Sequence, residues 1–287
     1  MSLGLCCQYI ESFQKNGITE YKNTTNEKTL RRGQLLENKY SNEFIESIWL
    51  NNLQGLLDVL IKINKQGIKV FRFSSNLLPL FDFCEEHKKS NKVLSLLSDI
   101  GEFVISKNIR LTTHPDQFCV LSSDKESVIQ NSIKILEYHA WIMDRMNLPE
   151  STFYCINIHG GKKGNSEKLI QSINKLNKNI RNRLTLENDE SSYNVKDLHE
   201  INLRTNIPVV FDSHHHTFNN AGFTIPEAME VAISTWDDKP LTHLSNTEPS
   251  LVNSNFANKR KHSFYTYYIP ECQLNANNND GIDIEFE

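Results

Sequence analysis

Six segments of the chain share one pattern, a short apolar run followed at once by a histidine or a carboxylate residue. In chain order, these residues are His114 in THPDQF, His159 in NIHGG, Glu187 in LENDE, Asp212 before three histidines in FDSHHH, His243 in LTHLS and Glu285 in DIEFE. A single histidine in such a place is more often a packed or surface residue than a ligand. Six in succession predict a shared site, because buried unpaired carboxylates are costly without a cation.

The mixture of imidazole and carboxylate side chains, without thiolate, suits Zn²⁺, Mn²⁺ or Fe²⁺. The set holds more ligands than one ion needs, so we expect two or three divalent metal ions. Ions clustered in this way activate water and stabilise the attacking and leaving oxygens of a phosphodiester. Hydrolysis of a phosphate ester is therefore the expected chemistry.

The elements that must position these residues alternate between short strands and longer amphipathic helices. Eight strands are expected near residues 3–8, 69–74, 109–113, 153–158, 183–187, 207–212, 240–245 and 282–286. Helical periodicity fills the intervals, as in 41–67, which ends at Gly67. Parallel strands need crossover helices, and eight such units predict an α/β fold, a (β/α)₈ TIM barrel formed by one domain over residues 1–287. The six side chains would meet at the carboxyl ends of its strands.

Two polar stretches, residues 13–40 and 246–262, are expected to be long loops beside the active site. The Asn-rich stretch NANNND is expected to be a turn or loop. The chain has no internal repeat and neither of the glycine-rich phosphate-binding patterns, so no nucleotide cofactor is expected.

Composition narrows the classes of protein further. The 287 residues carry a formal net charge of −4, which argues against binding nucleic acid by bulk electrostatics. Local basic patches remain, at Lys162 with Lys163 and at Lys259, Arg260 and Lys261. The N-terminus lacks a secretory signal, and no apolar run approaches the roughly 20 residues of a membrane span. Six cysteines without a C-x-x-C pair favour a reducing compartment, the cytoplasm or, in a eukaryote, the nucleus.

Seven motifs in order, RFSSNLLPL, THPDQF, NIHGG, LENDE, VVFDSHHH, THLS and DIEFE, resemble those of the UV damage endonuclease family over essentially the whole chain. The resemblance implies a barrel related to endonuclease IV and the xylose-isomerase-like enzymes. It also implies Mn²⁺ as the metal and cutting of double-stranded DNA on the 5′ side of photoproducts and other lesions, through water activated by metal. A monomer or weak dimer is expected.

The resemblance also implies roles for single residues. The implied metal ligands are His114, His159, Glu187, Asp212, His215, His243 and Glu285, with His262 completing a third metal position beside His215. Glu187 would be the bridging carboxylate, and Glu187 and His215 the catalytic residues. The implied DNA and lesion contacts are Gln117 and Phe118, the counterpart of a probing Gln-Tyr pair, Gln8 or Tyr9 after the first strand, and the basic run Lys259, Arg260 and Lys261.

The chain departs from the family pattern in four places. The tyrosine and asparagine that the family has just after the first strand are not evident, and Gln8 or Tyr9 would substitute for them. Leu241 stands where the family has a lysine two residues before the histidine of the seventh strand. The sequence therefore does not decide whether the third metal position is functional. Phe83 lies nearest to a family histidine after the S-x-x-x-P-L motif. The family's C-terminal extension through E-A-K is expected to be missing, with the N-terminal loop or a second subunit covering that sector.

Two alternatives keep part of this interpretation. One is a metal-dependent sugar isomerase or other small-molecule enzyme of the same barrel superfamily, which would need a closed polar pocket. The other is a protein that binds damaged DNA without cutting it. The fold alone does not separate them from the endonuclease.

Overall fold

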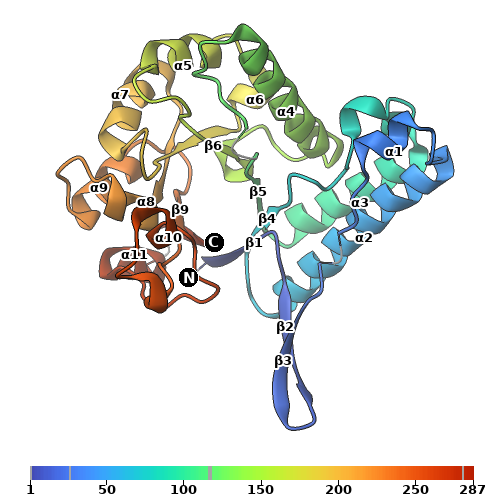
Figure 1. Cartoon of the computed structure of the whole chain (residues 1–287), viewed down its shortest axis with the longest axis horizontal. Coiled ribbons are helices and arrows are strands. Elements are labelled where there is room, and N and C mark those ends of the chain that lie inside the picture. Colours follow the sequence, from blue (N-terminus) through green and yellow to red (C-terminus); the bar gives the residue numbers. More distant parts are fainter. Residues whose placement is uncertain (1, 26, 116–117, 280) are drawn as a thin grey trace.

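Eight parallel strands in the described part of the chain close into a barrel (Figure 1). The computed structural model describes residues 2–25, 27–115, 118–279 and 281–287. The barrel strands are β1 (Ser2–Cys6), β4 (Val70–Phe73), β5 (Arg110–Thr113), β6 (Ile156–His159), β7 (Leu184–Glu187), β8 (Val209–Asp212), β9 (Leu241–Leu244) and β10 (Asp283–Phe286). Strand β1 pairs with β4 on one side and with β10 on the other. The predicted (β/α)₈ fold is confirmed.

Helices cover the outside of this barrel (Figure 1). They are α1 (Arg32–Leu36), α2 (Asn42–Lys65), α3 (Asn91–Ser106), α4 (Glu126–Arg145), α5 (Ser166–Ile173), α6 (Lys178–Arg181), α7 (Val195–Thr205), α8 (Ser213–Phe218), α9 (Ile225–Ile233), α10 (Phe256–Lys259) and α11 (Glu271–Asn278). Short 3₁₀ turns lie at Phe81–Phe83, His87–Lys89, Thr152–Tyr154 and Pro249–Leu251.

Local sequence sets where these helices begin and which face they bury. The Ser41 side chain accepts a hydrogen bond from the Phe44 backbone N–H and starts α2. Along α2, the buried residues recur every three or four positions, as Trp49, Leu53 and Leu60 illustrate, because that spacing forms one face of a helix.

The floor of the barrel combines a buried ion pair with an apolar cluster. Arg110 donates to Asp283 across 3.0 Å, and Lys239 lies 2.9 Å from the same carboxylate. Above them, Leu241 is fully buried in a cluster with Val70 and Cys155. Successive inward residues of a strand are two apart, so Leu241 supports His243, the next inward residue of β9.

Part of the expected N-terminal loop is instead a β-hairpin, so the prediction for residues 13–40 was wrong over its first third. Strands β2 (Ile10–Lys15) and β3 (Ile18–Asn23) pair in antiparallel fashion and project away from the barrel (Figure 1). Asn16 and Gly17 form the turn with φ values of 54° and 77°, the positive values that a two-residue hairpin turn requires.

The Asn-rich stretch was also predicted wrongly, since most of it belongs to α11. Gln273 and Asn277 are buried and anchor this helix through their side-chain amides. Gln273 donates to the Thr242 hydroxyl and the His243 carbonyl, and Asn277 donates to the carbonyls of Ser2 and Ile282. Polar side chains therefore attach α11 to β9 and β1, which is why its sequence lacks an apolar stripe.

Candidate metal centre

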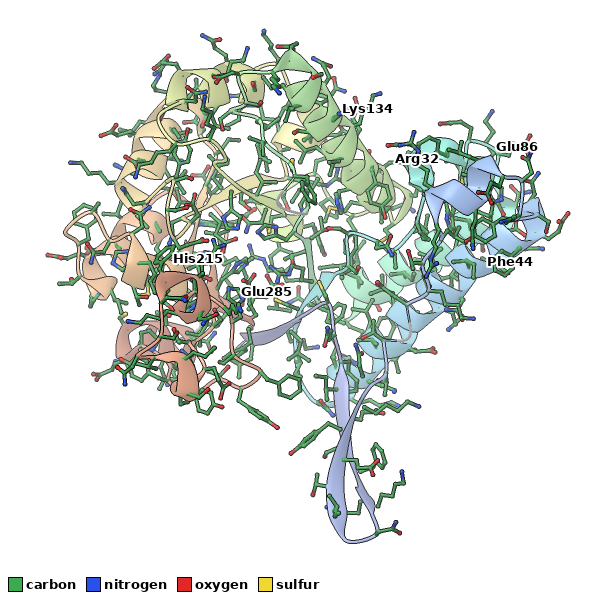
Figure 2. The ribbon with its side chains drawn as sticks, viewed as in Figure 1. Arg32, Phe44, Glu86, Lys134, His215 and Glu285 are labelled. Carbon is green, nitrogen blue, oxygen red and sulfur yellow. The ribbon has the colours of Figure 1, made fainter. Side chains whose placement is uncertain are left out.

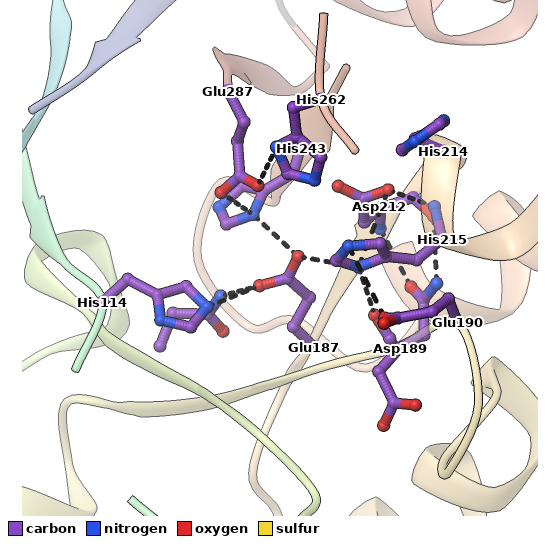
Figure 3. Close-up of polar contacts among 12 residues, drawn as sticks. His114, Glu187, Asp189, Glu190, Asp212, His214, His215, His243, His262 and Glu287 are labelled. Atoms are coloured by element: carbon purple, nitrogen blue, oxygen red, sulfur yellow. Dashed lines mark hydrogen bonds and ion pairs between the residues drawn. The ribbon is translucent and has the colours of Figure 1, made fainter. Parts of the chain in front are cut away.

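Glu187 lies at the end of β7, fully buried, and is the middle of a cluster of histidine and carboxylate side chains (Figure 3). Its Oε2 lies 3.0 Å from His114 Nε2 and accepts a hydrogen bond from the Asn157 amide. Its Oε1 lies 3.1 Å from His243 Nδ1 and 3.5 Å from His215 Nδ1. Four elements thus bring one side chain each to the same carboxylate.

Strand register explains why these residues meet. His159 of β6 is the register partner of Glu187, and Asp212 of β8 is the partner of His243. All four lie at or near the carboxyl ends of parallel strands, which share one rim of the barrel. The ligand atoms fall into two groups, each within 4.8 Å: His114, His159 and Glu187 form one, and Glu187, Asp212, His243 and Glu287 form the other.

Hydrogen bonds within the protein do not satisfy all the nitrogen and oxygen atoms of this cluster. His114 Nδ1 donates to the Pro115 carbonyl at 2.9 Å, so a neutral His114 ring turns the lone pair of Nε2 toward the Glu187 carboxylate. Two lone pairs 3.0 Å apart need a proton or a cation between them. Within the described residues, buried atoms without a hydrogen-bond partner include His159 Nδ1, Glu187 Oε1, Asp212 Oδ2 and His243 Nδ1. Unsatisfied buried nitrogen and oxygen atoms in one cluster fit divalent cations.

The pKa shifts point the same way. Burial alone would raise the pKa of Glu187, but His243 and His159 hold it well below its ordinary value. Burial would lower the pKa of His243, yet Glu187 and Glu287 raise it well above the usual range. The pKa of His159 is lowered, mainly by burial, which favours the neutral ring that binds metals. The carboxylates of the cluster thus stabilise positive charge beside them, which a proton on a ring or a bound cation can supply.

At the end of β10, the structure corrects the choice of carboxylate. Glu287, rather than the expected Glu285, joins the second group: its Oε1 lies 3.1 Å from His243 Nδ1. Glu285 accepts from the Thr112 hydroxyl at 2.8 Å and faces the opposite nitrogen of His243 at 2.9 Å. Both point into the barrel because they are two residues apart, and Glu287 is the one nearer the open rim.

A third position is less complete than the first two. Asp212 caps α8 by accepting from the His215 N–H, and His215 Nδ1 donates to the Asn188 carbonyl at 3.0 Å. The rings of His215 and His262 have centroids 5.6 Å apart, and the His262 Nδ1 lies 3.5 Å from Glu287. In the ranges that the structure describes, these two histidines belong to no group of three ligand atoms within 4.8 Å.

The residues expected to touch DNA fall into different environments. Phe118 is 73% exposed, and Gln117 lies outside the described residues. Gln8 is exposed, but Tyr9 is only 6% exposed and its hydroxyl accepts from Gln66. Tyr9 is therefore part of the core, and its expected contact with DNA was wrong because the connection between β1 and β2 turns its side chain inward.

A cavity of about 620 Å³ opens over the centre. Arg260 and Lys261 line it together with His262, whereas Lys259 belongs to α10. Arg260 pairs with Glu190, a residue within the LENDE motif that sequence reasoning did not single out. Arg72, which pairs with Glu287, was also missed, because an arginine inside a strand gives no such signal. Away from this cavity, Lys162 pairs with Asp124.

Comparison with known proteins gives consistent matches. Residues 3–285 match the family described as UV-endonuclease UvdE. A UV DNA damage endonuclease of Nostoc sp. is 40% identical over 242 residues, which are 81% of this chain and 73% of the relative. A UV DNA damage endonuclease of Bacillus cereus is 31% identical over 248 residues, covering 82% and 76%.

Solved structures agree at the level of the fold. A structure titled "Crystal Structure of SacUVDE" superposes with a TM-score of 0.79 at 29% identity, covering all of this chain and 92% of the other. A D-psicose 3-epimerase from Clostridium cellulolyticum superposes with a TM-score of 0.54 at 14% identity, covering 80% and 78%, and shows the fold alone. Across the described residues, the helices are too short or too polar to cross a membrane.

Proposed function

Since the chain belongs to the UV-endonuclease UvdE family, we propose that it is a metal-dependent endonuclease that hydrolyses a DNA phosphodiester on the 5′ side of UV photoproducts and other base lesions. Residues 1–287 would act as one metalloenzyme domain. The substrate would be double-stranded damaged DNA. The protein would bind it as a monomer or weak dimer, in the cytoplasm or, in a eukaryote, in the nucleus.

The observation that carries the proposal is the position of Glu187, whose two carboxylate oxygens face two separate ligand groups. We assign His114 and His159 to one ion, and Asp212, His243 and Glu287 to a second, with Glu187 bridging them. His215 and His262 are the candidates for a third ion. Mn²⁺ is our first choice, and Zn²⁺ or Fe²⁺ suit the same nitrogen and oxygen ligands.

When bound, such ions lower the pKa of a water molecule and stabilise negative charge on phosphodiester oxygens. The protein's own groups hold the ligands in place. Asn157 donates to Glu187 and fixes the orientation of the bridging carboxylate. Glu285 Oε2 lies 2.9 Å from His243 Nε2 and would orient the ring so that Nδ1 is the nitrogen available as a ligand, a common arrangement around metal-bound histidines. For Glu285, this positioning role replaces the direct ligation that the sequence predicted.

DNA would be held by a local basic rim rather than by net charge. Arg260 and Lys261 line the mouth of the cavity, where phosphates of the cut strand would pass. Glu190 pairs with Arg260 and holds its guanidinium at this rim. Phe118, on the loop after β5, is exposed enough to insert between bases, and Gln8 lies at the edge of the neighbouring cavity.

A nicking assay tests the proposal directly. A duplex with one defined photoproduct is incubated with protein and Mn²⁺, with chelator, and with chelator followed by excess Mn²⁺, and the undamaged duplex serves as control. We expect one nick 5′ to the lesion, lost with chelator and restored by metal. Purified protein that retains metal but leaves the damaged strand intact would refute the proposal.

A further inference from the structure

Exposed aromatic rings concentrate in one short stretch between α10 and α11. Four of the five residues in 264–268 are aromatic, and they are 62%, 50%, 52% and 62% exposed: Phe264, Tyr265, Tyr267 and Tyr268. We call this stretch the aromatic segment. Contiguous exposed rings mark binding surfaces more often than they mark packing, because they keep a large apolar area in water.

The aromatic segment has no regular secondary structure, yet one side chain fixes its backbone. Asn246 accepts from the N–H groups of Tyr267 and Tyr268 at 2.6 and 3.0 Å, and its amide donates to the Tyr268 carbonyl at 3.0 Å. The Ser263 N–H donates to the Asn246 carbonyl. The rings are therefore presented on an ordered frame, which lowers the entropy cost of binding a ligand.

A groove of about 840 Å³ runs between the aromatic segment and the base of the β2–β3 hairpin. Gln8 and Ile10 line its hairpin side, and the side chain of Tyr265 interacts with that of Tyr21 on β3, a contact that raises the pKa of Tyr265. Leu5 and Cys6 at the end of β1 also line the groove. The groove shares Cys7, Arg72, His262 and Glu287 with the cavity over the metal centre, so the two are continuous.

The lining of this groove suits flat rings better than phosphates. Of the described residues that line it, Arg72 and Glu287 carry charge, and they pair with each other. Phe264 and Tyr265 meet edge to face at an interplanar angle of 85°, which leaves ring faces free. Base faces stack on such rings regardless of sequence.

We propose that the groove between the aromatic segment and the β2–β3 hairpin binds unpaired nucleobases of the DNA by stacking, next to the metal centre. The inference rests on the proposed function, since it takes the same DNA as the ligand. A lesion weakens base pairing, so bases near it can leave the helix at lower cost and reach an aromatic surface.

The test measures binding in the presence of chelator, so that no strand is cut. The probe is a photoproduct duplex with 2-aminopurine beside the lesion, and its fluorescence is quenched when the base stacks. We compare the wild type with the double variant Phe264→Leu/Tyr265→Leu, which keeps apolar bulk but removes two rings, and with Tyr265→Phe, which keeps the ring. Phe44→Leu is the matched control, since Phe44 is a comparably exposed ring on α2, far from His215 and Glu285 (Figure 2).

We expect the double leucine variant to bind the duplex about 10-fold more weakly for each base that loses an aromatic stacking partner. The quenching of 2-aminopurine fluorescence should be lost as well. Tyr265→Phe and Phe44→Leu should bind like the wild type, and thermal unfolding should show that all variants are folded. Unchanged binding and quenching in the double variant would overturn the inference, as would an equal loss in Tyr265→Phe, which would assign the effect to the hydroxyl group.

The proposed function is judged separately, by the wild type with Mn²⁺. A wild type that nicks the duplex while the double variant binds normally leaves the endonuclease standing and removes the stacking groove. A wild type that binds the duplex without nicking it refutes the proposed endonuclease activity. The comparison of binding between wild type and variants then still decides whether the groove binds bases.

Discussion

Nε2 of His243 lies 2.9 Å from Oε2 of Glu285, while the other ring nitrogen faces Glu187 and Glu287 at 3.1 Å. One histidine thus separates two kinds of carboxylate. Glu285 is deeper in the barrel and already accepts from Thr112, whereas Glu287 lines the cavity. The roles we propose for the two glutamates differ accordingly, and they can be separated by experiment.

The first prediction compares Glu285→Gln with Glu287→Gln. Glu287→Gln should lose about one metal ion per chain, because it removes a ligand of the second group. Glu285→Gln keeps an acceptor for His243 and should retain its ions, with nicking slowed about 10- to 100-fold, the usual effect of disturbing a residue that orients a ligand. Elemental analysis and nicking rates check both. Metal loss in the opposite order would show that the assignment is reversed.

The second prediction concerns Glu187→Gln. The amide cannot supply two negatively charged oxygens to two ions, so nicking should fall more than about 100-fold, beyond the effect of supporting residues. Circular dichroism should report a folded barrel. Glu137→Gln, on the exposed face of α4, is the matched control and should nick at the wild-type rate. Substantial turnover by Glu187→Gln would exclude a bridging role.

The third prediction concerns Phe118→Ala. Because Phe118 is largely exposed, its loss should leave stability within about 0.5 kcal/mol of the wild type. If the ring inserts at the lesion, the ratio of affinities for damaged and undamaged duplex should fall about 10-fold, while metal content stays constant. Fluorescence anisotropy with both duplexes measures the ratio. An unchanged ratio would remove Phe118 from lesion recognition.

The fourth prediction concerns pH and His139, a fully buried residue on α4 whose Nδ1 contacts the Thr113 hydroxyl at 2.9 Å. Burial, aided by the charge of His114, lowers its pKa from 6.5 to about 3. Between these values the unfolded chain binds a proton that the folded protein does not, so the free energy of unfolding falls as the pH falls.

His139→Gln cannot take up this proton. In this window, the free energy of unfolding of the wild type should fall by about 1.4 kcal/mol more per pH unit than that of the variant. This difference in slope does not depend on how far the stabilities of the two proteins differ at neutral pH. Urea unfolding at several pH values between about 6 and 4.5, inside this window, gives both slopes. Parallel slopes would mean that His139 is charged when folded.

The barrel was predictable because eight short strand-like runs alternate with helical periodicity, and six of the runs end in a histidine or a carboxylate residue, as the run ending at Glu187 does. The choice between Glu285 and Glu287 was not, because residues two apart share a face and only the depth of the strand in the barrel decides which reaches the rim. Tyr9 was misassigned for a related reason, since sequence alone does not say which way the chain turns after β1.

Two elements were predicted wrongly for different reasons, since one carried a local signal and the other did not. Asn16 and Gly17 between alternating residues are typical of a two-residue hairpin turn, but the polarity of the flanking residues favoured a loop. Helix α11 has few apolar residues, because Gln273 and Asn277 attach it through hydrogen bonds to backbone and hydroxyl groups that no local pattern predicts. Polar anchoring of this kind is visible only once the strands are in place.

The pairing of β1 with β10 joins Ser2 to Asp283, so the barrel wall depends on strands from opposite ends of the sequence. During translation, β1 and β9 each keep an open edge until the residues near Asp283 have left the ribosome. Open strand edges promote association with other chains, and contacts so distant in sequence form slowly. We therefore expect nascent chains of this protein to depend on chaperones until β10 has been made, and fragments ending before Asp283 to aggregate rather than persist as partial barrels.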